Sequence, residues 1–147
     1  MNIRKKVEHL IRTHDTRDPY KMIANMDNVF LIEYPLGNTR GFYHYFQKMN
    51  VIYIDERLPW HEKKFVCAHE MGHMILHKTC NAVFMDTRTQ FNTSKFELDA
   101  NRFAVEFLIP DEIILENIYM TTGQLSQMLG YQESFVELKL EVFREIH

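Results

Sequence analysis

Two histidines separated by three residues are the part of this sequence best suited to chemistry. They lie in the run His69-Glu70-Met71-Gly72-His73. On a helix this spacing places both imidazoles on one face, about one turn apart, so that both can bind a single cation. Zinc suits such ligands, and because it lowers the pKa of a bound water to about 7, a neighbouring carboxylate can accept the proton of that water. The pattern therefore predicts a hydrolytic Zn²⁺ site with His69 and His73 as metal ligands and Glu70 as the catalytic base.

A third metal ligand is expected on the next helix, which the pattern predicts from Lys95 to Ile109, because catalytic zinc normally has three protein ligands. Glu97 falls at the edge of the apolar face of that helix, one turn before Ala100, whereas Asp99 points away from the centre of the face. We therefore expect Glu97 as the third ligand and keep Asp99 as the alternative. Asp99 or Asn101 is also a candidate hydrogen-bond partner for a ligand imidazole.

The helix that carries the motif is expected to run from Pro59 to His77 or Lys78. Its apolar positions form one stripe: Phe65, Val66, Met71, Met74, Ile75 and Leu76. This stripe favours a central helix over the alternative of two surface histidines and a solvated Glu70. Gly72 costs about 1 kcal/mol against alanine inside a helix, so a close approach of another backbone would explain it. Ala100 and Ala104 on the next helix are small enough to permit that approach.

The remaining elements predict an α+β fold. Helical spacing opens the chain at residues 3–11, and a second helix is expected after Asp18-Pro19, where Asp can cap and Pro suits the first turn. Residues 29–34 and 41–46 are expected to form a hairpin, and 51–55 a third strand, giving a small three-stranded antiparallel sheet packed against the pair of helices that carries the expected metal ligands. Residues 79–94 are expected to be irregular, with Ser94 capping the following helix. Further helices are expected after Pro110 and around Gly123 and Gly130.

Length and composition indicate one domain over residues 1–147, with a short helical tail, 111–147, packed on it, and the expected metal site makes that domain metallopeptidase-like. The start of the chain lacks the apolar segment of a secretory signal, and no apolar run is long enough for a membrane span, so we expect a cytoplasmic protein without membrane contact. About 20 Å of helix would separate Cys67 from Cys80, which argues against a disulfide. The tail holds seven acids against Lys139 and Arg144, which disfavours direct nucleic-acid binding.

Other residues leave alternatives open. Tyr43, His44, Tyr45 and Tyr53 lie on expected strands, and any one of them can be imagined stabilising an oxyanion. His77 lies one turn after His73, where a histidine stabilised by the helix dipole is expected more often than a ligand. Residues 121–131 have the rhythm of a helix-turn-helix but contain no Lys or Arg, so core packing is the preferred interpretation.

Two segments resemble the ImmA/IrrE family of metallopeptidases: the HExxH segment with Ile75-Leu76-His77, and residues 97–104 with Leu108-Ile109-Pro110. The resemblance implies a gluzincin-type zinc endopeptidase with a thermolysin-like pair of helices. It further implies action on a helix-turn-helix transcriptional repressor of a phage or mobile element. Family members often have Glu at the position of Asp99, which is one methylene shorter. The competing hypothesis is an anti-repressor that binds the repressor through the same fold without cutting it; the intact Glu70 favours catalysis.

Overall fold

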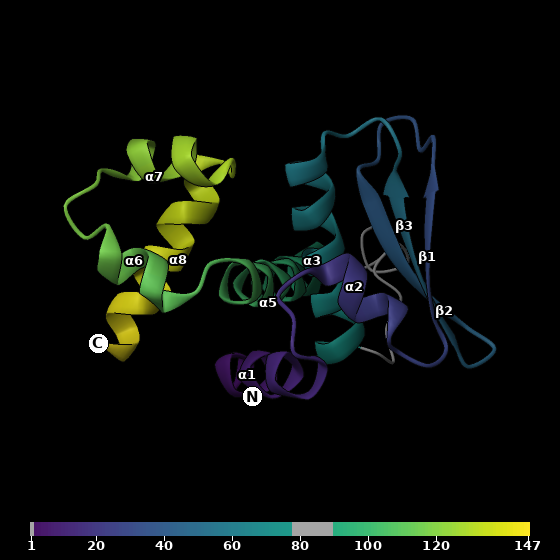
Figure 1. Cartoon of the computed structure of the whole chain (residues 1–147). Helices are drawn as coiled ribbons and strands as arrows, with labels where there is room; N and C mark the ends of the chain where they lie inside the picture. The colour runs from purple at the N-terminus through teal and green to yellow at the C-terminus, as the bar shows by residue number, and fades with distance from the viewer. Residues whose placement is uncertain (1, 78–89) are drawn as a thin grey trace.

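The computed structural model describes residues 2–77 and 90–147, with residues 90–94 described by their backbone alone. In Figure 1 the sheet and the last three helices lie at opposite ends of the molecule, with α3 and α5 between them. The elements are α1 (Ile3–His14), α2 (Pro19–Ala24), β1 (Val29–Tyr34), β2 (Gly41–Phe46), β3 (Met49–Asp55), α3 (Trp60–Leu76), α5 (Gln90–Leu108), α6 (Asp111–Glu116), α7 (Thr122–Leu129) and α8 (Glu133–Ile146). The α+β class is confirmed. No helix in the described ranges combines the length and apolarity of a membrane span.

The sheet is mixed, so the expected antiparallel order is wrong in part. The strand order is β1-β3-β2, with β1 parallel to β3 and β2 antiparallel to β3. The hairpin forms between β2 and β3, because Gln47 and Lys48 both adopt positive φ, the geometry of a tight two-residue turn. β3 occupies the centre, with Ile52 and Ile54 fully buried. β1 therefore pairs with the remaining edge of β3, although the turn chemistry after Tyr34 had favoured its pairing with β2.

The two central helices, α3 and α5, pack closely. A Cβ added to Gly72 would lie 3.1 Å from Cα of Ala100 and 3.1 Å from Cβ of Phe103. The expected close approach of a second backbone at Gly72 is thus confirmed, and Ala100 and Ala104 are fully buried between the helices. α5 begins at Gln90, so the predicted start at Lys95 with a cap at Ser94 is wrong. The rest of the expected irregular connection, from Thr79 to residue 89 and including Cys80, lies outside the described residues.

Both helices of the N-terminal segment form as expected. Asp18 caps α2 by accepting hydrogen bonds from the backbone N–H groups of Tyr20 and Lys21, and Pro19 occupies the first helical position. These contacts satisfy N–H groups that have no partner inside the helix. α2 contributes the buried side chains of Met22 and Ile23 to the core that α3 and β3 share.

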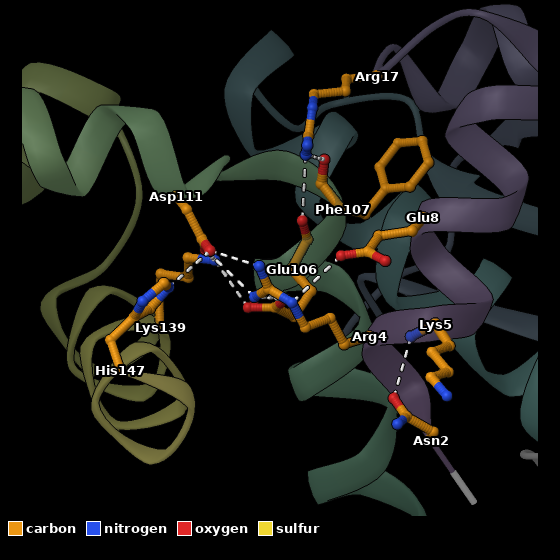
Figure 2. A network of polar contacts seen from close by, with 10 residues as sticks. All are labelled: Asn2, Arg4, Lys5, Glu8, Arg17, Glu106, Phe107, Asp111, Lys139 and His147. Carbon is orange, nitrogen blue, oxygen red and sulfur yellow. Dashed lines mark hydrogen bonds and ion pairs between the residues drawn. The ribbon is translucent and has the colours of Figure 1, made fainter.

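A buried cluster of charged side chains, which we call the acid–base cluster, ties the C-terminal helices to the rest of the fold (Figure 2). Lys139 of α8 is 1% exposed, and its Nζ lies 2.7 Å from Oε1 of Glu106 and 2.8 Å from Oδ1 of Asp111. Arg4 of α1 pairs with the same two carboxylates. The expected short helix around Gly123 is α7, which ends with Gly130 as its C-cap, but the helix after Gly130, α8, is longer than expected at 14 residues.

Candidate metal centre

The HExxH residues lie on the inner side of α3, where they face α5. His73 is fully buried, Glu70 is 5% exposed and the His69 side chain is 14% exposed. One potential ligand atom from each of the three lies within 4.8 Å of the other two. The Nε2 atom of His69 is 3.9 Å from Oε1 of Glu70. The helix thus places two imidazoles and a carboxylate around one small volume, as the i and i+4 spacing predicts.

The facing helix brings a second carboxylate to the same place. Oε2 of Glu97 lies 3.0 Å from Nε2 of His69, and Oε1 lies 2.9 Å from Nε2 of His73. Asp99 lies elsewhere, with its Oδ2 3.5 Å from Nε2 of His77. Of the two acids that sequence reasoning left open, it is therefore Glu97 whose carboxylate bridges the imidazoles.

The outer nitrogens of both imidazoles have partners of their own. Nδ1 of His69 lies 2.8 Å from Oδ1 of Asn101, an atom that can only accept, so this ring nitrogen carries the proton. Nδ1 of His73 lies 3.3 Å from Nδ1 of His77. If His73 donates there, the remaining proton of His77 is on Nε2, which faces Asp99. In both rings this arrangement leaves Nε2 as the nitrogen available to a cation.

The charges at the centre shift the pKa of two groups. Burial alone would raise the pKa of Glu97, but hydrogen bonds from His69 and His73 outweigh it and hold that pKa below its ordinary value. Burial alone would lower the pKa of His69, but the hydrogen bond to Glu97 and the charges of Glu70 and Glu97 outweigh it, so the pKa of His69 is raised. The carboxylates thus stabilise positive charge at this point.

The residues present fit a divalent metal ion. Two imidazole nitrogens and one carboxylate form the His₂Glu donor set of several catalytic zinc sites. The carboxylate of Glu97 lies within hydrogen-bond distance of both Nε2 atoms and favours positive charge there, and a bound cation would supply that charge in place of protons. Glu70 lies beside this donor set without having to join it. The arrangement can therefore hold a metal ion next to a separate carboxylate that accepts protons.

A cavity of about 310 Å³ opens beside the centre. Its lining includes His69, Glu70 and Glu97, together with Gly41 and Phe42 from the start of β2. The expected oxyanion candidates do not line it. Tyr43 is fully buried and its hydroxyl donates to Oδ1 of Asn50 at 2.5 Å; burial raises its pKa to about 12.

Sequence reasoning missed two residues near the centre. Phe135 of α8 and Arg40 line the cavity, although neither belongs to a motif. His77, which its spacing from His73 made a candidate for a dipole-stabilised histidine or, less often, a ligand, is buried against His73 and Asp99. Cys67, also on α3, is fully buried, and burial raises the pKa of its thiol.

Comparison with known proteins identifies the family of this chain. The profile of a peptidase family described as the IrrE N-terminal-like domain matches residues 26–140. The chain is 36% identical to "Uncharacterized immunity region protein 2" of Bacillus phage phi105, over 93% of this chain and 88% of that protein. It is 30% identical to "Metallopeptidase ImmA" of Bacillus subtilis (strain 168), over 88% of this chain and 76% of that protein. With two histidines and a glutamate converging at its centre, this chain belongs to the ImmA/IrrE family of metallopeptidases.

Proposed function

We propose that this protein is a zinc-dependent endopeptidase in which His69, His73 and Glu97 hold the metal and Glu70 is the catalytic base. The observation that supports it best is the convergence of both imidazole Nε2 atoms on one carboxylate of the facing helix, at 2.9 and 3.0 Å. Three protein ligands leave one coordination position open, as a catalytic site requires. Asp99 is the less favoured ligand because its carboxylate faces His77.

Glu70 performs the proton transfers in this proposal. A zinc ion bound at the centre would polarise the peptide carbonyl and make a coordinated water acidic near neutral pH. The Glu70 carboxylate accepts the proton of the attacking water and delivers it to the leaving amine nitrogen. Its position 3.9 Å from Nε2 of His69 places it next to the ligand set, and its burial keeps bulk water away from the transferred proton.

Two positioning groups hold the imidazoles. Asn101 fixes the ring of His69 through Nδ1, and the chain from His73 through His77 to Asp99 fixes the ring of His73. Such outer partners orient ligand rings and raise their basicity. In this proposal Asn101 takes the role expected for a partner of a ligand imidazole, whereas Asp99 faces His77.

The substrate binds along β2 in this proposal. Within the described sheet β2 pairs on one side only, with β3, and its first residues Gly41 and Phe42 line the cavity at the metal centre. An extended peptide can hydrogen-bond to such an unpaired strand edge. This mode of binding holds the main chain of the substrate and leaves its side chains to select the site of cleavage.

The natural substrate we propose is a helix-turn-helix repressor of a phage or mobile element. Support comes from the names of the relatives, one an immunity region protein of a phage and the other a metallopeptidase. Cleavage would separate the DNA-binding part of the repressor from its oligomerising part. Paired half-site binding would then be lost and affinity for the operator would fall.

The test compares wild type with Glu70→Gln, which keeps the shape of the side chain but cannot accept a proton. Both are loaded with zinc and mixed with the repressor encoded nearest to the gene of this protein. We expect repressor fragments with wild type and none with Glu70→Gln, at equal zinc content. Fragments formed at the wild-type rate by Glu70→Gln would refute the role of Glu70 as base.

The same experiment separates the peptidase from the non-cleaving anti-repressor. If operator binding falls equally with wild type and Glu70→Gln while the repressor stays intact, the anti-repressor hypothesis replaces the peptidase. A chelator control distinguishes the two further, because removing zinc abolishes hydrolysis. Binding through the fold alone would survive chelation if the apoprotein stays folded, which circular dichroism checks.

A further inference from the structure

A second cavity adjoins the cavity at the metal centre. It measures about 300 Å³ and lies between the start of α3 and the connection from α7 to α8. We call it the side pocket. Arg40, Phe65 and Phe135 line both cavities, and Tyr131 and Gln127 line only the side pocket. A ligand that extends from the metal centre past Phe65 therefore reaches the side pocket.

A row of rings leads from the metal centre into the side pocket. Phe65 lies one helical turn before His69, with the two rings stacked at a centroid distance of 6.4 Å. Phe135 stacks on Phe65 at 3.8 Å, and Tyr131 lies 6.2 Å from Phe65. Phe65 is only 5% exposed and Tyr131 only 8%. The three rings of Phe65, Tyr131 and Phe135 thus form the apolar part of the side pocket, and the rest of its lining is mostly polar: Arg40, His61, Glu62, Ser126, Gln127, Gly130 and Gln132.

Two charged residues of the side pocket pair with each other, so neither is left over to bind a charged ligand group. Arg40 and Glu62 both line it, and they pair with each other at 3.7 Å. A charged ligand group would have to compete with that pair, whereas an apolar group gains by leaving water for contact with rings. The guanidinium of Arg40 keeps further N–H donors that suit a main-chain carbonyl oxygen of a bound peptide.

The ring of Phe65, which lines both cavities, lies a short stretch of extended peptide away from the ring of His69. A strand rises about 3.3 Å per residue, so 6.4 Å between the His69 and Phe65 rings is close to two residues. Because side chains of an extended peptide alternate between faces, residues two apart point the same way. A side chain about two residues from the cleaved bond is therefore the one that reaches the side pocket.

The side pocket is held in shape by the acid–base cluster. Phe135 and Lys139 lie one turn apart on α8, and Lys139 is held by Glu106 of α5 and by Asp111. The wall that carries Phe135 is thus attached to the helix that carries Glu97. A cavity fixed in this way loses little entropy when a ligand enters, which increases affinity.

We propose that the side pocket is a specificity site that binds a large apolar side chain of the substrate, best an aromatic one, about two residues from the cleaved bond. This inference rests on the proposed peptidase function, of which it names the substrate preference. It predicts that cleavage sites in the natural substrate carry Phe, Tyr, Trp or Leu at that spacing. Gly, Asp or Lys there should be disfavoured by about tenfold or more.

The test uses a positional peptide library and two tryptophan variants. Eight-residue peptides of Gly, Ser and Ala carry Phe, Leu, Gly, Asp or Lys at one position each. Zinc-loaded wild type is incubated with them, and cut positions are mapped by mass spectrometry. Peptide affinity is measured separately in zinc-loaded Glu70→Gln, alone and combined with Gln127→Trp. Gln127 is an exposed residue of α7 that lines the side pocket, so a tryptophan there should fill the pocket. Met128→Trp, at an exposed neighbouring position that lines neither cavity, is the matched control.

We expect cuts about two residues from Phe or Leu, and Phe peptides that bind Glu70→Gln at least about tenfold more tightly than Gly peptides. Gln127→Trp should remove this difference and Met128→Trp should keep it. Equal affinity for Phe and Gly peptides, or a preference that survives Gln127→Trp, would overturn the inference. If no peptide is cut but the Phe preference is present and lost in Gln127→Trp, the side pocket stands and the peptidase proposal fails.

Discussion

Replacing Gly72 by alanine tests whether the packing of α3 against α5 positions the metal ligands. Alanine is the better helix former by about 1 kcal/mol, so a helix in isolation would gain stability. In this protein the new methyl group would instead meet Cα of Ala100 at 3.1 Å, Cβ of Phe103 at 3.1 Å and the carbonyl oxygen of Ala100 at 3.2 Å. The first and third are backbone atoms of the facing helix, which cannot move aside as a flexible side chain can.

The magnitude follows from these distances. Carbon atoms prefer separations of about 3.5 Å or more, so the helices must move apart by a few tenths of an ångström. Overpacking of this kind costs about 1–3 kcal/mol, against the helix gain of about 1 kcal/mol. We expect a free energy of unfolding lower by up to about 2 kcal/mol. Glu97 lies one turn before Ala100, so the same shift should weaken its contacts with the imidazoles and reduce zinc affinity about tenfold.

The assay is urea unfolding of the metal-free protein, followed by zinc titration against a competing chelator. The pair Lys64→Ala and Lys64→Gly, at a half-exposed position of the same helix, measures the helix-propensity difference. If Gly72→Ala is stabilised by the difference that this pair shows and zinc affinity is unchanged, the reasoning from close packing is refuted.

Three further outcomes are expected. Glu97→Ala should weaken zinc binding more than Asp99→Ala in a competitive titration, because only the Glu97 carboxylate contacts both imidazole Nε2 atoms; the reverse order would make Asp99 the ligand. Lys139→Met should lower the free energy of unfolding by less than the about 3–5 kcal/mol of a fully uncompensated buried charge, because buried Glu106 and partly buried Asp111 lose Lys139 but keep Arg4, and adding Glu106→Gln should recover part of that loss; without recovery, uncompensated charge is not the cause. Burial alone would raise the pKa of Asp111, but hydrogen bonds from Arg4 and Lys139 outweigh it and hold the folded-state pKa below the ordinary 3.8. Its stabilising contribution is therefore present above about pH 4 and lost as pH falls below it, so the slope of stability against pH there, measured by urea unfolding, should be smaller in Asp111→Asn; an unchanged slope would contradict this assignment.

Local features of the sequence were sufficient to predict α1, α2, α3 and the central motif. Helical periodicity is repeated along each segment, so α1 and α3 could be recognised without knowing their neighbours. Asp18 and Pro19 marked the start of α2 for the same reason, since a cap acts on residues two or three positions away. The i and i+4 spacing of His69 and His73 likewise carries its geometry within one turn of helix.

Strand order and the choice of side-chain partners required the tertiary structure. The turn after β1 suggested a hairpin with β2. Strand order depends instead on which strand is buried at the centre of the sheet, and that strand is β3. Glu97 and Asp99 differ by two positions on one helix, and only the packing of α5 on α3 at Gly72 decides which carboxylate meets the imidazoles. Phe135 lies on a helix 66 positions after His69, and no local pattern can place a residue so distant in the chain at the cavity beside the metal centre. Contacts of this kind depend on how the surfaces of two segments fit together. The spacing of residues within either segment alone does not determine that fit.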